Sequence, residues 1–586
     1  MEATSSYESP LLTNIAEDGC TDLHGRLVSR KLRGGWKASL LIIGVEVAER
    51  FCYNSVYNNL LSYLTNVMHQ SAATAAKNVN VWYGVASMLP LVGGYLSDCC
   101  LGQYTTIILS SLVYLLGLIC LTLAASLTFF IPPPCDKTSF SCPSPTVYQV
   151  GFLFISLYLV ALAQGGHRPS IQAFGADQLD ERDPTERKSK SSFFNWWNFG
   201  ISIGLLLSGV VIVYIQENVG WGIGFAIPTV AMAIAFSVFM CGTIMYQHKI
   251  LPSTNPIIRI LQVFVAASLK WNVSIDSQGE QNLSVDQGFS ETTKLLPTDQ
   301  FRFLDKATIE INLDHENRTN LDWRLCTVTQ VEEAKLVLRL LLIWVSCLMY
   351  GVVFAQSSTF FTKQGSTMDR RVIGNLKIAG ASMQNFITIT VLVLVPVYDQ
   401  IFVPLARSIT GNKRGITLLQ RIGVGMFISV ISMVVAAVTE MKRLQVAKEY
   451  GLIDMPQVTI PLSIFWLLPQ YILFGIADVF AVVGLQELFY DQMPETMRSL
   501  GIALYLSIFG VGSFLSSFLI CIIEELSSRG GGQNWFADNL NKAHLDYYYW
   551  LLVALSALFL CIYLIFANCF IYKKEESNVY RDEEIS

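Results

Sequence analysis

The sequence predicts an all-α integral membrane protein with twelve transmembrane helices. Of its 586 residues, 52% are hydrophobic and only 15% are charged, which is too apolar for a soluble chain of this size. A helix needs about 20 apolar residues to cross roughly 30 Å of hydrocarbon. Stretches of about that length are predicted at 39-63, 79-98, 104-128, 147-168, 192-215, 222-245, 335-357, 379-398, 418-439, 462-486, 499-523 and 549-572.

A long polar stretch divides the predicted helices into two sets of six. We expect an amino-terminal half over residues 39-245, a central loop over 246-334, and a carboxy-terminal half over 335-572. The loop is rich in Asp, Glu, Ser and Thr, and a composition of this kind favours disorder in its middle. Its start, residues 255-267, predicts a helix along the membrane face.

An even number of spans places both chain ends on the same side of the membrane. Lys and Arg are more frequent in the flanks and short loops on the amino-terminal side, which assigns that side to the cytosol. The tails over residues 1-38 and 573-586 and the central loop are then cytosolic. Cys135 and Cys142 fall in a loop on the opposite side, where they are candidates for a disulfide.

Composition and motifs exclude several classes of function. A net charge of -5 gives no basic surface for nucleic acid. No Ser-His-Asp spacing, metal-ligand cluster or phosphate-binding glycine loop accompanies the spans, so we expect neither an enzyme nor a bound metal or cofactor. The expected partners are a small-molecule or anion substrate, protons and the lipid bilayer. The sequence does not indicate an oligomeric state.

Three ionisable residues, Glu46, Glu49 and Arg50, interrupt the first apolar stretch. A charge at the centre of a membrane helix costs about 2.5 to 3.5 kcal/mol, so such groups face a polar interior and find partners. Their spacing places all three on one helical face. One interpretation is a structural salt bridge between helices. The other is proton traffic, which the second carboxylate favours because one acid already suffices to pair with Arg50.

Further motifs lie at fixed places relative to the spans. The turn between spans two and three reads Gly93-Gly-Tyr-Leu-Ser-Asp98-Cys-Cys-Leu-Gly102 and resembles the gating turn of the major facilitator superfamily, with Gln103 where a basic residue is common. Four motifs are specific in combination: Glu46-x-x-Glu49-Arg50, Phe174-Gly-Ala-Asp177-Gln178, Phe193-Phe-Asn-Trp-Trp197 and Gln492-Met-Pro-Glu-Thr-Met497.

Together these motifs resemble the proton-coupled oligopeptide transporter family, in particular its plant nitrate/peptide branch, from about Trp36 to Tyr572. The run Gly165-Gly-His167-Arg168-Pro169 is similar to the vacuolar-membrane clade of that branch. The resemblance implies the major facilitator fold, in which two six-helix halves rock around a substrate near the midplane.

The resemblance also implies how protons are handled. Glu46, Glu49 and Arg50 would couple proton binding to transport, with Arg168 in the family's basic position on span four. A guanidinium stays protonated in proteins, so the coupled proton would bind to the carboxylate of Glu46 or Glu49. An alternative places Arg168 at a helix end, reaching toward the headgroups. For His167, neutral packing and titration are both open.

Substrate-binding residues are expected on four spans, and Arg168 of span four is one of them. Tyr53 can donate a hydrogen bond to a substrate, and Asn54 replaces a second tyrosine that family members often carry. Asp478 occupies the position of a family acid that contacts the cationic end of a substrate or a partner in the opposite half. Phe354 and Gln356 are expected to line the pocket, and Phe354 stands where one nitrate-binding pattern has a histidine.

The sequence therefore predicts a proton-coupled symporter of nitrate, a di- or tripeptide, or a plant metabolite or hormone. The alternative is a membrane sensor that retains the scaffold without flux. Thr106 matches a site phosphorylated in a relative, although its position favours a plain helix-start threonine. The segment Glu8-Ser-Pro-Leu11-Leu12 is close to an acidic dileucine sorting signal and favours the vacuolar membrane over the plasma membrane.

Overall fold

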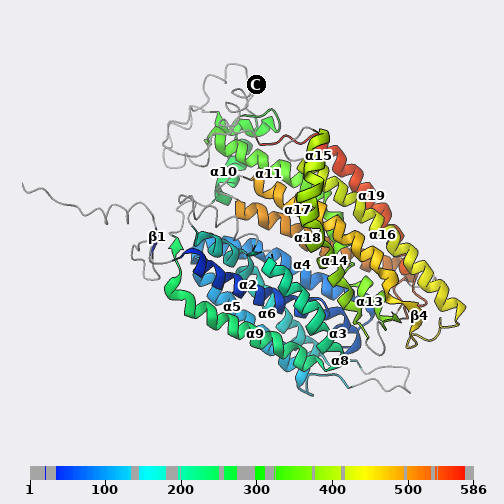
Figure 1. The fold of residues 1–586 in the computed structure, drawn as a ribbon. Coiled ribbons are helices and arrows are strands. Elements are labelled where there is room, and N and C mark those ends of the chain that lie inside the picture. The colour runs from blue at the N-terminus through cyan, green and yellow to red at the C-terminus, as the bar shows by residue number, and fades with distance from the viewer. Residues whose placement is uncertain are drawn as a thin grey trace, which may run out of the picture.

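The chain folds into a bundle of long helices, seen here in a computed structural model (Figure 1). The structure describes residues 20–21, 34–133, 144–179, 196–197, 199–249, 256–272, 297–309, 323, 325–371, 377–410, 416–493, 498–529, 535–537 and 539–573. Cys135, Cys142, the dileucine-like segment, the start of the Phe193–Trp197 motif and the end of the Gln492–Met497 motif lie outside these residues.

The elements are almost entirely helical. The first half contains β1 (Cys20–Thr21), α2 (Gly35–Tyr57), α3 (Leu60–Asn66), α4 (Ala72–Leu96), η2 (Ser97–Leu101), α5 (Gln103–Ser126), α6 (Val147–Asp177), η3 (Ser208–Ile212), α8 (Val213–Asn218), α9 (Trp221–Cys241), η4 (Gly242–Met245) and β2 (His248–Lys249). The remainder contains α10 (Pro256–Leu269), η6 (Arg302–Thr308), α11 (Val328–Ser346), α12 (Leu348–Phe354), α13 (Phe360–Ser366), β3 (Met368–Asp369), η9 (Gly380–Gln384), α14 (Asn385–Val397), η10 (Tyr398–Phe402), α15 (Val403–Thr410), α16 (Leu418–Glu449), β4 (Ile460–Ser463), η11 (Ile464–Leu467), α17 (Leu468–Gln492), α18 (Arg498–Arg529) and α19 (Leu545–Asn568).

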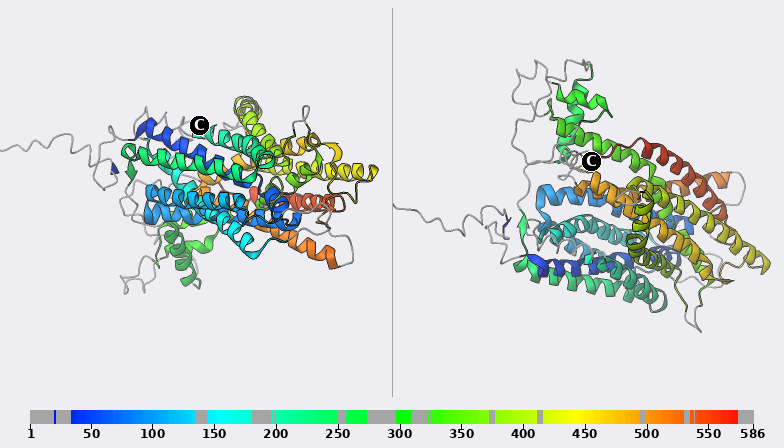
Figure 2. Two further views of the ribbon diagram at one scale, coloured as in Figure 1. Left: turned by 90° about the horizontal axis from the view of Figure 1, so that it is seen from below. Right: turned by 45° about the horizontal axis from the view of Figure 1, so that its top comes forward.

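The helices form two groups that meet along α4 and α18. In one group α6 packs on α4 and α5, and α9 packs on α2 and α5. In the other, α17 packs on α14, α16 and α18, and α19 packs on α16. Two views show the blue-to-green group beside the yellow-to-red group (Figure 2). The strands form only two small two-stranded sheets, β1–β2 antiparallel and β3–β4 parallel.

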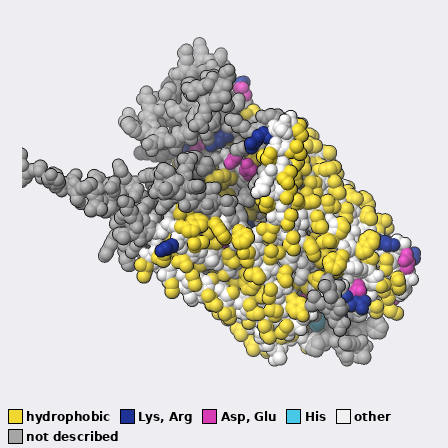
Figure 3. All heavy atoms as spheres, viewed as in Figure 1, with side chains coloured by type: hydrophobic (Ala, Val, Ile, Leu, Met, Phe, Trp, Pro, Cys, Tyr) yellow, Lys and Arg dark blue, Asp and Glu magenta, His cyan; other side chains and the backbone are white. Residues whose placement is uncertain are grey.

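Length and apolarity are consistent with a protein that crosses a membrane repeatedly. Within the described residues, nine helices are long and apolar enough to span a bilayer, or ten if the bent pair α11–α12 is one span. Each predicted span coincides with a helix or a helix series. Two predicted spans correspond to helices that are not among these nine or ten. They are α2, which contains charged residues, and α4. Hydrophobic side chains cover most of one face, and charged side chains gather toward its two ends (Figure 3).

Three predicted span boundaries are wrong for identifiable reasons. The first span breaks into α2 and α3 at Asn58 and Asn59, a residue type that favours turns over helix interiors. Span seven begins at Val328 rather than 335, because Thr327 and Gln330 form a reciprocal capping box there. It also bends by 43° between α11 and α12. Span four continues past 168 to Asp177, with Pro169 inside the helix.

Part of the predicted central loop is folded against the carboxy-terminal group. The expected helix at the start of the loop is present as α10, which packs with η6 against α11 through Val263, Leu304 and Val331. The buried amine of Lys335 forms ion pairs with Asp305 at 2.6 Å and with Glu332 at 2.8 Å. This segment is therefore fixed to the start of span seven.

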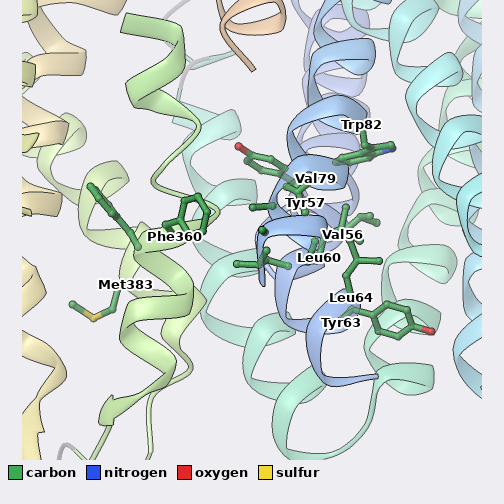
Figure 4. Close-up of a cluster of buried hydrophobic side chains, with 14 of the residues drawn as sticks. Val56, Tyr57, Leu60, Tyr63, Leu64, Val79, Trp82, Phe360 and Met383 are labelled. Atoms are coloured by element: carbon green, nitrogen blue, oxygen red, sulfur yellow. The ribbon is translucent and has the colours of Figure 1, made fainter. Parts of the chain in front are cut away.

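The two groups also make polar contacts, at the end of the bundle where α2 ends and α4 begins. Lys77 pairs with Glu524 at 2.8 Å, Arg370 pairs with Glu217 at 2.8 Å, and Tyr57 shares a 2.8 Å hydrogen bond with Ser358. The largest hydrophobic cluster lies at this end. Figure 4 shows Tyr57, Leu60 and Trp82 of the first group, and Phe360 and Met383 of the second, which all belong to it. The groups are thus held together at this end.

Candidate functional site

The charged residues of α2 form a buried ionic cluster. Arg50 Nε lies 2.7 Å from Glu46 Oε1 and 3.1 Å from Glu49 Oε2, and all three side chains are at most 6% exposed. The helical spacing that places them on one face is the spacing predicted from the sequence. The second oxygen of Glu46 and both oxygens of Glu49 have no hydrogen-bond partner among the described residues. Arg50 therefore leaves the pair of carboxylates with one negative charge in excess.

A histidine from another helix completes this cluster. His167 on α6 is fully buried, and neither ring nitrogen has a hydrogen-bond partner in the described part of the chain. Ligand-type atoms of Glu46, Glu49 and His167 all lie within 4.8 Å of one another. Such a group can hold a metal ion in principle. We assign none, because Arg50 already lies against both carboxylates and would repel a divalent cation.

Close packing of α6 on its neighbours brings His167 to the carboxylates. A Cβ on Gly93 of α4 would lie 2.1 Å from the carbonyl oxygen of Gly165, and a Cβ on Gly166 would lie 2.2 Å from Ser110 Oγ of α5. Pro169 has no N–H to bond that Gly165 carbonyl, which instead faces α4. Only glycine permits these approaches. Gly93, predicted as part of the gating turn, therefore has a packing role here.

Arg168 lies inside α6 and carries an uncompensated charge. The alternative that placed it at a helix end is wrong, because the helix continues to Asp177. It forms no ion pair or hydrogen bond within the described residues. The phenol groups of Tyr83 on α4 and Tyr505 on α18 lie close enough to interact with it electrostatically, as does Glu49. Arg168 is therefore a fixed cation near the boundary between the two groups.

The second helix group carries a buried acid, Asp478 of α17. Its carboxylate accepts a 2.5 Å hydrogen bond from the hydroxyl of Tyr350 on α12, and its side chain is 8% exposed. No cation pairs with it among the described residues. Tyr350, in the same half as Asp478, is a partner that sequence reasoning did not assign.

Aromatic side chains lie near the two charges, and Tyr83 and Tyr505 are each close enough to interact electrostatically with both. Phe354 stacks on Tyr83 of the opposite group with ring centroids 6.2 Å apart, and it contacts Phe509 edge-on at 4.9 Å. Tyr53 is buried and stacks on Trp82 at 5.5 Å. Phe354 therefore lies at the boundary, as expected for a pocket residue. No signal singled out Tyr83 or Tyr505, because aromatic residues at helical spacing usually pack.

Two predicted substrate residues have their amides engaged within the protein. The Asn54 amide donates to the Arg50 carbonyl at 2.8 Å, and this steadies the turn of α2 that carries Arg50. The Gln356 amide donates to the Val352 carbonyl at 2.8 Å and to Ser516 Oγ of α18 at 3.1 Å. Gln356 is fully buried there. Its contacts join helices within the carboxy-terminal group.

The remaining predicted positions lie around the gating turn. Gly102 adopts φ 79°, a conformation that favours glycine, just before α5 begins. Gln103 donates to Asp177 at 3.4 Å, so a neutral side chain keeps a contact there. The backbone of Asp98 lies in η2, but its side chain is outside the described atoms. Thr106 is buried, and its hydroxyl donates to the Gly102 carbonyl at 2.9 Å.

Two bundles around buried charges and an aromatic boundary define a membrane transporter of the major facilitator fold. The family model described as PTR2, POT family, matches residues 104–536. The chain is 49% identical to Protein NRT1/PTR FAMILY 5.10 of Arabidopsis thaliana over 95% of this chain and 97% of that protein. It is 44% identical to Protein NRT1/PTR FAMILY 5.4 of the same plant, over 94% and 97%. The chain belongs to the POT family, on its NRT1/PTR branch.

Solved structures share the fold. An auto-inhibited POT family peptide transporter aligns with a TM-score of 0.68 at 20% identity, covering 92% of this chain and 98% of that chain. A POT family transporter in complex with 5-aminolevulinic acid aligns with a TM-score of 0.61 at 14% identity, covering 92% and 98%. At these identities the likeness establishes the fold alone.

The ionic cluster on α2 predicts how the stability of an Arg50 variant depends on pH. Arg50→Met leaves two adjacent buried carboxylates without a counter-ion, which costs about 3 to 5 kcal/mol when both are ionised. Protonation removes the repulsion, so the loss should shrink as the pH falls. We expect the melting temperature of the purified variant to lie well below that of the wild type at pH 8 and to approach it at pH 5.

The matched control is Arg371→Met, which removes an arginine from an exposed pair with Asp369. We expect it to change the melting temperature little at either pH, because exposed pairs are screened by water and salt. A deficit in Arg50→Met that does not change between pH 5 and pH 8 would show that the carboxylates are not the source of the instability.

Proposed function

We propose that the chain is a proton-coupled symporter of a small charged solute that works by alternating access. The observation that carries this proposal is the excess carboxylate of the α2 cluster, which is buried beside only one guanidinium. Such a site is neutral when one carboxyl group is protonated and carries one negative charge when that proton is released, so it can take up and release a single proton. A structural salt bridge would need only one of the two acids.

The solute is proposed to bind between Arg168 and Asp478. These two charges come from opposite helix groups, and neither has an ion-pair partner among the described residues. A solute with an anionic end would satisfy Arg168, and one with a cationic end would satisfy Asp478. The aromatic rings of Tyr83 and Phe354 supply apolar contact between these ends. The arrangement favours a small zwitterion such as a di- or tripeptide and also admits an anion such as nitrate or an anionic plant metabolite or hormone.

The proton gradient is sufficient to drive accumulation of the solute. Moving one charge down about 100 mV releases about 2.3 kcal/mol. Each pH unit adds about 1.4 kcal/mol. Because a tenfold concentration ratio corresponds to about 1.4 kcal/mol, one proton can support a solute gradient well above tenfold.

The first test concerns proton coupling. Glu46→Gln and Glu49→Gln remove the proton acceptors while keeping size and polarity. We expect either variant to lose uphill, pH-driven uptake in proteoliposomes while retaining a folded, monodisperse protein. Uptake would be screened across nitrate, dipeptides and plant hormones, with proton movement followed by an internal pH dye.

The control is Glu449→Gln, an exposed acid at the end of α16, which should leave uptake and proton movement unchanged. Normal uphill uptake with normal proton movement in both α2 variants would refute the coupling proposal. Solute binding to the wild type without flux at any imposed gradient would instead identify a sensor that has kept the transporter fold.

The second test concerns the class of solute. Removing the cation with Arg168→Gln should abolish binding of any solute with an anionic end. Asp478→Asn should weaken the binding of a zwitterion by about tenfold or more. It should leave the binding of a simple anion such as nitrate nearly unchanged. Binding to purified protein by calorimetry separates these effects from flux. Equal losses for nitrate in both variants would contradict the proposed division of roles.

We also propose the vacuolar membrane as the location. The support is the dileucine-like segment near residue 11 and the likeness of the Gly165–Pro169 run to a vacuolar clade. In an acidic vacuole, symport would move solute toward the cytosol. A fluorescent fusion should label the vacuolar membrane of a plant cell, and labelling of the plasma membrane alone would refute this location.

A further inference from the structure

His167 is fully buried, and a buried histidine normally has its ring nitrogens hydrogen-bonded. Here both ring nitrogens lack partners within the described residues. Leaving a buried donor or acceptor unsatisfied costs about 1 to 3 kcal/mol. Ligand-type atoms of Glu46 and Glu49 lie within 4.8 Å of its ring, and one oxygen of Glu46 and both oxygens of Glu49 also lack hydrogen-bond partners among the described residues. Three groups with unused hydrogen-bonding capacity thus face one another across two helices.

We infer that His167 is a positioning residue for the exchangeable proton, with a neutral imidazole that donates to an ionised carboxylate and accepts from a protonated carboxyl. Neutral histidine is well suited to this task because one ring nitrogen is a donor and the other an acceptor. The mutual distances of up to 4.8 Å exceed one hydrogen bond. A rotation of either glutamate side chain, or one bridging water, would complete the contact.

The charges around His167 favour its neutral form. Glu46, Glu49 and Arg50 face it from α2, and Arg168 is its neighbour on α6. Tyr114 of α5 lies near Glu49 and contributes no charge while protonated. A proton on the imidazole would create a third buried cation beside Arg50 and Arg168, whereas a proton on a carboxylate neutralises a buried charge. The proton therefore remains on a carboxyl group, and His167 acts through that group.

The direction of the effect follows from the strengths of the two hydrogen bonds. A hydrogen bond to an ionised carboxylate is about twice as strong as one between neutral groups. His167 therefore favours the ionised form and eases release of the proton. Its role in transport rests on the proposed symport, whereas its effect on proton binding can be measured without any flux.

The test is an infrared titration of the wild type and of His167 variants, purified in lipid nanodiscs. The carbonyl stretch of protonated carboxyl groups reports proton binding, and Glu46→Gln and Glu49→Gln assign the bands that belong to the site. In His167→Leu, which neither donates nor accepts, we expect the titration midpoint to rise by about one pH unit, or about tenfold tighter proton binding. His167→Gln keeps a donor and an acceptor and should stay close to the wild type.

The matched control is Ser170→Ala on the same helix, where a buried hydroxyl that donates to Gly166 is removed without touching the carboxylates. It should leave the midpoint unchanged. If His167→Leu does not fold, His167→Met provides an unbranched apolar side chain for the same comparison. An unchanged midpoint in the apolar variants would overturn the inference.

A shift of the midpoint toward acid in His167→Leu would also overturn it, because that result would mean that His167 stabilises the protonated carboxyl group more than the ionised one. Failure of the proposed symport has a different signature, which is loss of proton-driven uptake by the wild type in proteoliposomes. A protein without flux would still give the infrared result, so the two conclusions are tested independently.

Discussion

The excess negative charge of the α2 cluster constrains the arrangement of the amino-terminal helices. Two carboxylates and one guanidinium cannot face lipid without a large penalty, so α2 must turn this face toward the interior. The helix α6 contacts α2 at this face, and Gly165 and Gly166 let α6 pack closely on α4 and α5. His167 and Arg168 follow these glycines directly. One helical turn therefore supplies both the group near the carboxylates and the cation assigned to the proposed solute site.

The two helix groups are joined at one end by contacts that are individually weak. The pairs Lys77–Glu524 and Arg370–Glu217 are partly exposed, and pairs of that kind contribute about 0 to 1 kcal/mol each. The proposed driving force of one proton, a few kcal/mol, is of the size needed to break them. Arg168 and Asp478 lie between the groups without pairing with each other. Within the described residues, the separation of the groups is therefore not opposed by a deeply buried ion pair between them.

Much of the site was predictable because it follows from local spacing. Glu46, Glu49 and Arg50 share a face in any helix, and the apolar stretches fixed the order of the spans. The parts that were not predictable depend on tertiary packing. Pro169 suggested a helix end, but packing against Gly93 keeps α6 continuous to Asp177. The partner of Asp478 is a tyrosine 128 positions away, and Gln356 faces a neighbouring helix through Ser516. No single-residue pattern encodes either contact.

In the proposed symport, proton binding and solute binding are linked through Arg168. Glu49 attracts this cation electrostatically, and a proton on Glu49 removes that attraction. Arg168 is then less compensated, and an anionic group of the solute gains the interaction that Glu49 gives up. Linkage is reciprocal, so a bound anion must raise the proton affinity of the carboxylates by the same factor. No movement of a helix is required for this step. The proposed coupling depends on the electrostatic interaction of Arg168 on α6 with Glu49, which is fully buried on the contacting helix α2.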